Sequence, residues 1–285
     1  MIRMKTTAIQ LCFSSIFCVA LPVFALDMTP AEAQPYVVKN LNIAVLPVKT
    51  IVPITAQTAE QAIAQAQVIA NNPNADIAEF RIDLLAFSTD TQKVIRLGQQ
   101  LNQILKDKPL IATIRTHNEG GKMTVSDEDY EKIYREYLKV PFMQLLDIEM
   151  FRDASRVAQL TKLAHAQNVL VIMSNHDFAK TPAQQEIENR LFQQDQMGAD
   201  ILKIAVMPQS KQDVLTLMNA TLAVSQKSQK PLLTMSMGQL GTISRVATAN
   251  IGGNLSFGMI GEASAPGQID VTQLKQLLKT VQPIQ

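Results

Sequence analysis

The chain has 285 residues, of which 47% are hydrophobic, and its formal net charge is +1. This length suits one large domain or two small ones, and the composition is that of an ordinary globular protein. Because the net charge is near zero and the chain has no basic block, neither nucleic acid nor an anionic membrane is expected as a partner.

The first 25 residues differ from the rest of the chain. Arg3 and Lys5 form a short positive segment, an apolar stretch follows, and Val23–Ala25 offers small residues where an export peptidase reads. This pattern predicts a secretory signal peptide over residues 1–25 and a periplasmic mature protein without stable membrane insertion. A retained membrane anchor is the weaker alternative, because polar residues and a proline interrupt the apolar stretch.

Both cysteines, Cys12 and Cys18, lie inside the predicted signal peptide. The mature chain would therefore have no cysteine, which excludes disulfides, thiol catalysis and thiolate metal sites. Residues 26–40 are interpreted as a loose N-terminal lead-in. One catalytic domain is expected over residues 41–285, because no repeat, low-complexity tract or linker interrupts that range.

After residue 40, short apolar runs alternate with segments of helical spacing. The runs typical of strands lie at 42–48, 75–82, 109–115, 143–149, 168–174, 199–206, 231–237 and 255–261. Helical spacing is found at 58–71, 90–106, 126–139, 153–166, 183–197, 210–227 and 271–281, and least clearly at 239–251.

Nearly continuous apolar strands indicate burial on both faces, as in a parallel sheet covered by helices. Eight strand–helix units in about 245 residues predict an α/β fold, a single-domain (β/α)8 TIM barrel. An open doubly wound sheet is the alternative. It is disfavoured because Pro47–Thr50, and not a glycine-rich phosphate-binding turn, follows the first predicted strand.

Ionisable and polar residues gather where the predicted strands end, and this is the end at which such barrels carry their chemistry. The residues found there are Glu79, Arg81, Asp83, Arg115, His117, Glu119, Asp147, Glu149, His176, Asp177, Lys203, Ser236, Ser244, Arg245, Ser264 and Gln268. Their density makes this rim the candidate site.

Lys203 lies inside the apolar run 201–206 (ILKIAV). A lysine is almost never fully buried without a partner, so we expect it to reach the rim or to pair with a carboxylate such as Glu79 or Glu149. One interpretation is a structural ion pair inside the barrel. The other is an amine made reactive by burial and neighbouring cations, free to attack a carbonyl as a Schiff-base nucleophile.

His176 follows the fifth predicted strand, so it and Lys203 come from adjacent strands and could meet at one ligand. Histidine is the side chain best suited to moving protons near neutral pH. A histidine that only caps the turn before Pro182 is the alternative, which the neighbouring lysine disfavours. His165 lies on a predicted helix and is interpreted as a solvated or packing residue, and His117 is the less convincing candidate at the rim.

A metal site is not expected. The three histidines are spread along the chain without the spacing of a zinc site. Asp147 and Glu149 could hold Mg²⁺, but alternate carboxylates on a barrel strand more often neutralise neighbouring lysine or arginine. Arg81, Arg115 and Arg245 indicate an anionic substrate instead, since a guanidinium binds a carboxylate through two parallel hydrogen bonds.

Together, a lysine, a histidine and an anion-binding arginine define a class of reactions. The lysine forms an iminium with a ketone, which acidifies the neighbouring C–H bond, and the histidine removes that proton. Elimination of water, aldol cleavage and isomerisation all begin with these two steps, and composition and spacing leave all three reactions possible.

The motifs resemble those of the type I 3-dehydroquinate dehydratases from about residue 40 onward. The matching stretches are Ala75–Asp83 (ADIAEFRID), Ile114–Gly121 (IRTHNEGG), Val171–Pro182 (VIMSNHDFAKTP), Gly198–Thr216 (GADILKIAVMPQSKQDVLT), Thr234–Arg245 (TMSMGQLGTISR) and Ala263–Ile269 (ASAPGQI). The resemblance implies conversion of 3-dehydroquinate to 3-dehydroshikimate without a metal or organic cofactor, by a protein that is commonly a homodimer.

The resemblance also implies residue roles. Lys203 would be the Schiff-base lysine, His176 the general acid and base, and Glu119 the carboxylate that orients His176. Arg245 would hold the substrate carboxylate, and the ring hydroxyls would be bound or the site closed by Glu79, Arg81, Arg115, Ser264 and Gln268. Met237 would line the pocket, and the segment Ala263–Gln268 would form a mobile lid.

The predicted signal peptide is a departure from that family, whose familiar members serve aromatic amino-acid synthesis in the cytoplasm. An exported dehydratase fits the catabolism of quinate better, because dehydroquinate is then made at or beyond the inner membrane. Two alternatives are kept. One is a class I aldolase-type Schiff-base lyase, and the other is an exported solute-binding barrel that has lost activity.

Overall fold

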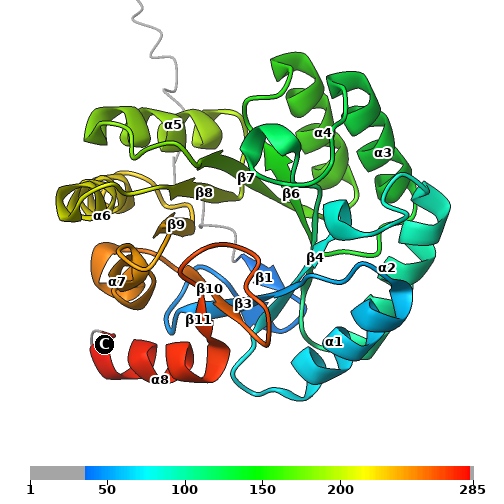
Figure 1. Ribbon diagram of the computed structural model, residues 1–285. Helices are drawn as coiled ribbons and strands as arrows, with labels where there is room; N and C mark the ends of the chain where they lie inside the picture. Colours follow the sequence, from blue (N-terminus) through cyan, green and yellow to red (C-terminus); the bar gives the residue numbers. More distant parts are fainter. Residues whose placement is uncertain (1–35, 283–285) are drawn as a thin grey trace, which may run out of the picture. The chain divides into compact units, whose positions relative to one another are not determined.

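The computed structural model describes residues 36–282, and a closed barrel of parallel strands forms its centre (Figure 1). Its strands are β3 (Lys49–Ile54), β4 (Ile77–Arg81), β5 (Leu110–Thr113), β6 (Leu145–Glu149), β7 (Leu170–Asp177), β8 (Ile201–Val206), β9 (Leu232–Ser236) and β10 (Leu255–Met259). From β3 to β9 each strand pairs in parallel with the next, and β10 pairs in parallel with β3. Between β9 and β10, where the barrel closes, the Asn254 amide donates to the Leu232 carbonyl over 2.9 Å.

Helices surround the barrel on its outer side (Figure 1). They are α1 (Ala59–Asn71), α2 (Thr91–Leu105), α3 (Asp127–Lys139), α4 (Ala154–Ala166), α5 (Gln184–Gln196), α6 (Lys211–Ser225), α7 (Thr242–Val246) and α8 (Val271–Val281). The segment 239–251, in which the helical spacing of the sequence is least clear, contains the short α7 and a 3-10 turn, η3 (Thr248–Ile251). The predicted (β/α)8 barrel is confirmed.

Side-chain caps explain where several helices begin. Thr58 accepts a hydrogen bond from the Gln61 amide and Gln61 returns one, which forms a capping box at the start of α1. Ser210 and Asp213 form the same arrangement at α6. These caps satisfy backbone donors that a helix end leaves without partners, so each helix starts at a defined residue.

The first barrel strand was predicted one segment too early. The apolar run 42–48 is not a barrel strand, because β3 spans Lys49–Ile54 and pairs with β4 and β10. The misassignment has a physical reason. The true strand begins with a lysine and contains Pro53, which lacks a ladder donor and normally argues against a central strand.

A short hairpin precedes the barrel, formed by β1 (Val37–Val38) and β2 (Leu41–Asn42). Val38 and Ile43 are buried against a layer of apolar side chains from the amino-terminal parts of the strands, including Ile77 and Ile201. The hairpin therefore covers the end of the barrel opposite to the strands' carboxyl ends.

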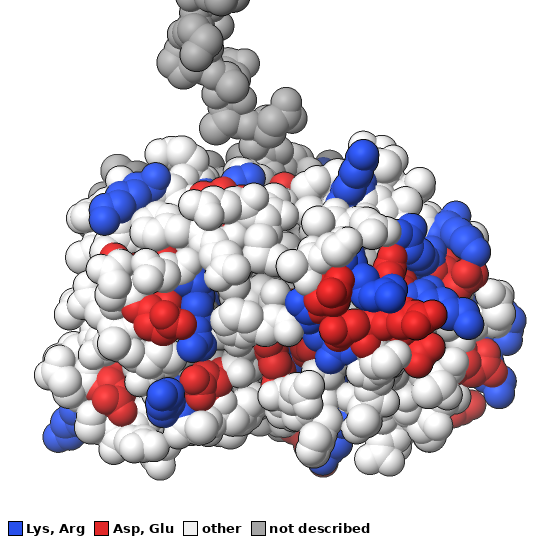
Figure 2. Space-filling model, turned by 90° about the horizontal axis from the view of Figure 1, so that it is seen from above, with Lys and Arg blue, Asp and Glu red and all other residues white. Residues whose placement is uncertain are grey.

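The predicted signal peptide over residues 1–25 and most of the predicted lead-in lie outside the described residues. Within residues 36–282, none of the helices has the length and apolar character needed to cross a bilayer. On the face seen in Figure 2, acidic and basic side chains are interleaved, and the densest mixture lies on the side of α3 and α4. There Glu131 pairs with both Arg135 and Arg156.

Candidate active site

A cavity that is partly open to solvent lies at the carboxyl ends of the strands. Its wall includes six of the charged or titratable residues predicted from the sequence: Glu79, Arg81, Arg115, Glu119, His176 and Lys203. Met237, Ser264 and Gln268 also line it. The barrel thus brings together residues from six strands or the loops that follow them.

Lys203 points into the barrel from β8 and is only 3% exposed. Its Nζ lies 2.7 Å from Asp147 Oδ2 and 3.9 Å from Glu79 Oε1. The expected pairing with a carboxylate such as Glu79 or Glu149 is confirmed for Glu79, and Asp147 on β6, which was not named as a partner, lies closer to the amine. The Nζ also lies 5.1 Å from the ring centroid of Phe257, so one side of the amine faces an aromatic surface.

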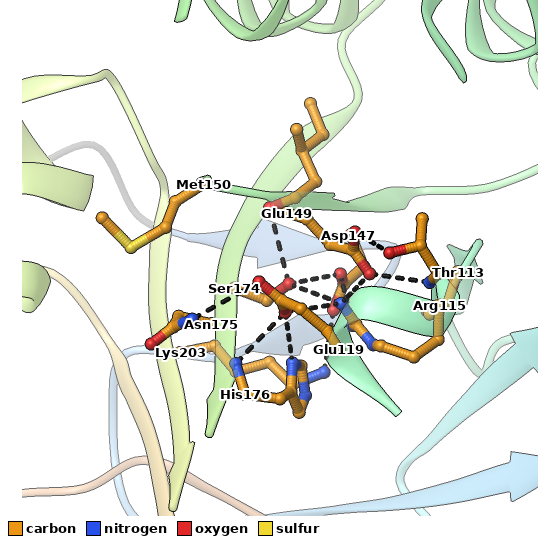
Figure 3. Close-up of polar contacts among 12 residues, drawn as sticks. Thr113, Arg115, Glu119, Asp147, Glu149, Met150, Ser174, Asn175, His176 and Lys203 are labelled. Carbon is orange, nitrogen blue, oxygen red and sulfur yellow. Dashed lines mark hydrogen bonds and ion pairs between the residues drawn. The ribbon is translucent and has the colours of Figure 1, made fainter. Parts of the chain in front are cut away.

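Arg115 connects the carboxylates at the floor of the cavity (Figure 3). Its Nη2 lies 2.6 Å from Asp147 Oδ1, and its Nη1 lies 2.9 Å from Glu149 Oε1 and 3.4 Å from Glu119 Oε2. Burial alone would raise the pKa of Asp147, but the charges of Arg115 and Lys203 outweigh it and lower that pKa to about 2. Asp147 and Glu149 therefore neutralise buried cations, the more frequent of the two roles considered for them.

His176 and Glu119 form a hydrogen-bonded pair on the cavity wall (Figure 3). The distance from His176 Nδ1 to Glu119 Oε2 is 2.8 Å, and the His176 backbone amide donates to the same oxygen over 3.1 Å. Because Oε2 already accepts the backbone proton, Nδ1 is assigned as a donor, which leaves Nε2 with its lone pair free for a ligand.

Burial lowers the pKa of His176 well below its usual range, and the charges of Arg115, Lys203 and Arg81 lower it further. Burial also raises the pKa of the Glu119 carboxyl to about 8. The two groups lie in hydrogen-bond contact, so they take up and release protons as a pair. The neutral imidazole favoured by this environment is the form that can accept a proton.

The arginines are placed differently from one another. Arg81 donates hydrogen bonds from Nε and Nη2 to the Asp83 carboxylate, each over 2.8 Å. Its Nη1 therefore remains available to bind a ligand. Arg245 is 1% exposed and does not line the cavity; its Nη2 donates to the Pro266 carbonyl over 3.2 Å. Among residues 36–282 its Nε finds no hydrogen-bond partner, and burial lowers its pKa to about 10. A buried guanidinium with so few acceptors suits an incoming anion.

The sequence model of the family described as type I 3-dehydroquinase matches residues 50–285. The chain belongs to the type I 3-dehydroquinase family. It is a 3-dehydroquinate dehydratase, a carbon–oxygen lyase of class EC 4.2.1.10.

Individual relatives agree with this assignment. The catabolic 3-dehydroquinate dehydratase of Acinetobacter baylyi is 77% identical over 257 residues, which are 90% of this chain and 94% of the relative. The solved 3-dehydroquinate dehydratase of Enterococcus faecalis is 40% identical with a TM-score of 0.82, covering 87% of this chain and 100% of that one. A type I enzyme from Clostridium difficile, solved with covalently modified comenic acid, is 35% identical with a TM-score of 0.82, covering 86% and 96%.

In this 3-dehydroquinase, the segment Ala263–Gln268 lies over the cavity. The Gly238 amide donates to the Pro266 carbonyl over 3.1 Å, and Ser264 and Gln268 join through two hydrogen bonds of 2.9 and 3.0 Å. Gly267 has a φ of +79° and packs so closely that an added Cβ would lie 2.2 Å from the Gly238 carbonyl oxygen. The segment is thus fitted against the β9 end, as a closed lid would be.

Sequence reasoning missed several residues of the site. Ser174 donates to Asp147 Oδ1 over 2.6 Å, and Asn175 donates to Glu119 Oε1 over 3.3 Å. Their signal was their place in the stretch that contains His176, where polar residues continue a buried strand. Of the other two histidines, His165 is half-exposed and pairs with Asp200 at 2.8 Å, as expected of a surface residue, and His117 does not line the cavity.

Proposed function

We propose that this dehydratase works through a Schiff base between Lys203 and its substrate, with His176 moving the protons. One observation carries the proposal: the buried Lys203 and the mostly buried His176, whose side chain is 11% exposed, come from the adjacent strands β8 and β7 and line the same cavity. The covalently modified comenic acid held by the relative from C. difficile supports covalent chemistry in such a site.

In the first half of the reaction, Lys203 passes a proton to the ketone oxygen of 3-dehydroquinate and its amine adds to the ketone carbon. A second proton then moves from the nitrogen to that oxygen, which leaves as water. The product is a positively charged iminium. Asp147 is ionised and lies 2.7 Å from Nζ, so its charge can stabilise the cation that forms there. The reaction needs no further charge to enter the barrel.

In the second half, His176 Nε2 takes the proton from C2, and the electrons of that bond move toward the iminium nitrogen. When they return, the C1–O bond breaks and His176 gives its proton to the departing hydroxyl, which leaves as water. Glu119 holds the imidazole through Nδ1 and stabilises its charged form in between. A second water then hydrolyses the iminium, which releases 3-dehydroshikimate and restores Lys203.

The remaining site residues would bind and enclose the substrate. Arg245 does not line the cavity while its Nη2 is bonded to the Pro266 carbonyl, so it would take the substrate carboxylate when that bond opens. Glu79, Arg81, Ser264 and Gln268 would bind the ring hydroxyls or close the site, with Met237 in apolar contact. Arg115 is already engaged by three carboxylates. Its contribution to substrate binding would therefore act through those groups.

We also propose that the enzyme catalyses the dehydration of 3-dehydroquinate as a step of quinate catabolism in the periplasm, and that it forms a homodimer. Residues 1–25 have the features of an export signal. The high similarity to a relative named as a catabolic enzyme supports the pathway. Cell fractionation tests the location, and uncleaved protein in the cytosol would contradict it. Sedimentation of the mature protein tests the dimer.

Borohydride reduction tests the mechanism. With 3-dehydroquinate present, reduction should leave an adduct on the peptide that contains Lys203, and the enone absorbance of 3-dehydroshikimate should rise in the absence of borohydride. Lys203→Ala should lose both signals. An adduct without the enone product would indicate an aldolase-type lyase, and binding without an adduct would indicate a binding protein.

A further inference from the structure

Helix α5 directs two polar side chains at the barrel from positions one turn apart. Residues four apart on a helix share a face, so Arg190 and Gln194 both face β7 and β8. Gln194 is completely buried, and the Arg190 side chain is 17% exposed. Both contact the strands that carry His176 and Lys203, although neither lines the cavity.

Gln194 binds both backbone polar groups of Lys203. The Lys203 amide donates to Gln194 Oε1 over 2.9 Å, and Gln194 Nε2 donates to the Lys203 carbonyl, also over 2.9 Å. The same nitrogen lies 3.3 Å from Met150 Sδ. An apolar residue in this place would leave the buried Lys203 amide and carbonyl without these two partners, which is costly. The amide therefore fixes the backbone from which the Lys203 side chain extends.

Arg190 reaches the other half of the site through Asn175. Its Nη1 donates to Asn175 Oδ1 over 3.0 Å. A guanidinium has only donors, so this contact turns the Asn175 oxygen outward and its amino group toward Glu119. That amino group donates to Glu119 Oε1 over 3.3 Å. With the amide reversed, an oxygen would face the carboxylate that holds His176.

We propose that α5 positions both reactive groups of the site, Lys203 through Gln194 and the Glu119–His176 pair through Arg190 and Asn175. Gln194 and Arg190 are positioning residues, since each acts through another residue. The inference rests on the catalytic roles proposed above for Lys203 and His176. It predicts defects in reaction steps, with little change in substrate binding.

The test of Gln194 compares neighbours on the same helix. Gln194→Met keeps the length and loses both hydrogen bonds, and Gln193→Met changes the exposed glutamine beside it. A displacement of reacting atoms by about 1 Å can cost about 100-fold in rate, so we expect Gln194→Met to lower kcat and the rate of borohydride-trappable imine formation by about 10- to 100-fold. KM should stay within about 3-fold of wild type, because the binding groups do not move.

A conservative variant separates positioning from folding. Gln194→Glu, assayed at a pH where its buried carboxyl is protonated, offers an acceptor and a donor and should recover most of the trapping rate relative to wild type at the same pH. Gln193→Met should match wild type in both rates. Wild-type trapping by folded Gln194→Met would overturn the role of Gln194. Failure of wild type itself to form an adduct would instead overturn the proposed function.

The Arg190 branch has a different readout, the pH dependence of kcat/KM. Arg190→Leu frees the Asn175 amide and weakens a donor to Glu119, so the acid limb of the profile should move to higher pH. Glu186→Gln is the matched control, because Glu186 bonds Arg190 Nε at 2.8 Å and has no contact with Asn175. An unchanged limb in Arg190→Leu, or an equal shift in both variants, would overturn this branch.

Discussion

The buried cations Arg115 and Lys203 lie at the floor of the cavity beside four buried carboxylates, those of Glu79, Glu119, Asp147 and Glu149. Arg115 is central, since it contacts Asp147, Glu149 and Glu119 within 3.4 Å. An ion pair inside a protein contributes little compared with apolar packing, but removing one partner leaves an uncompensated charge. The arrangement is therefore understood better as a means of holding charges in place than as a source of stability.

Arg115→Met should accordingly destabilise the fold strongly. It leaves Asp147 and Glu149 without their shared partner, and breaking a buried pair costs about 3–5 kcal/mol. Urea denaturation followed by circular dichroism measures the loss. Arg156→Met is the control, because Arg156 forms a solvent-exposed pair with Glu131, and the loss of such a pair should change the stability little. Equal losses in the two variants would contradict the central place of Arg115.

Glu119→Gln should move the acid limb of the kcat/KM profile to lower pH. Burial raises the pKa of the Glu119 carboxyl to about 8, whereas burial and the neighbouring cations lower the pKa of His176, so the proton that the pair takes up as the pH falls goes to the carboxyl. Without that carboxyl only His176, whose pKa is lowered, can take up the proton, so the variant should stay unprotonated further into the acid range. Its kcat should fall as well, because the imidazole is less well oriented. A limb that stays in place or rises would mean that another group controls the profile.

His176→Ala should separate the two halves of the reaction. Imine formation uses Lys203, so borohydride with 3-dehydroquinate should still trap an adduct. Turnover should fall by about 10²- to 10⁴-fold, the usual contribution of a general acid or base. Normal turnover in this variant would remove His176 from the mechanism.

The candidate residues could be found from the sequence because each breaks an apolar pattern at a strand end. Lys203 and His176 stand out for this reason, and the structure places both on the cavity wall. Their partners could not be chosen in the same way. Asp147 and Glu149 are two residues apart on one strand and face the same side, so only the geometry shows that Lys203 meets Asp147.

Among the elements, the regular helices were predictable and the entry to the barrel was not. The spacing of apolar residues predicts both ends of α1 to α6 and of α8 to within about two residues. Most of these helices begin after a capping residue that can also be recognised in the sequence. Residues 42–48 look more like a strand than Lys49–Ile54 does. They instead connect the hairpin to β3, and this depends on the long-range pairing of β3 with β10.

Gly267→Ala should impair closure of the lid. Its Cβ would collide with the Gly238 carbonyl oxygen at 2.2 Å, so the segment Ala263–Gln268 could not keep its place over the cavity. We expect KM for 3-dehydroquinate to rise about 10-fold or more, as for a displaced closing loop. Gly261→Ala is the matched control, because Gly261 also has a positive φ, +74°, with nothing within 4 Å of an added Cβ. Equal effects would show that backbone strain alone matters.

Across the whole molecule, the residues of the candidate active site and the apolar layer beneath them lie at opposite ends of the barrel. The carboxyl ends of the strands hold buried charges and a cavity, whereas the amino-terminal ends form an apolar layer covered by the hairpin. Lys39, in the turn of the hairpin, donates through Nζ to Asn102 Oδ1 and to the Lys108 carbonyl, both over 2.9 Å. The covered end can thus support the fold without taking part in the reaction.

Ile43→Ala should therefore lower stability without changing catalysis. Ile43 is fully buried beneath the barrel, and truncation of such a side chain costs about 2–5 kcal/mol. The midpoint of urea unfolding should fall accordingly, while kcat and KM of the folded protein at 25 °C should equal those of wild type, since the cavity lies at the other end. Val45→Ala is the control, because Val45 is 50% exposed in the same connection and should change neither quantity. A fall in kcat with unchanged stability would mean that the hairpin end communicates with the site.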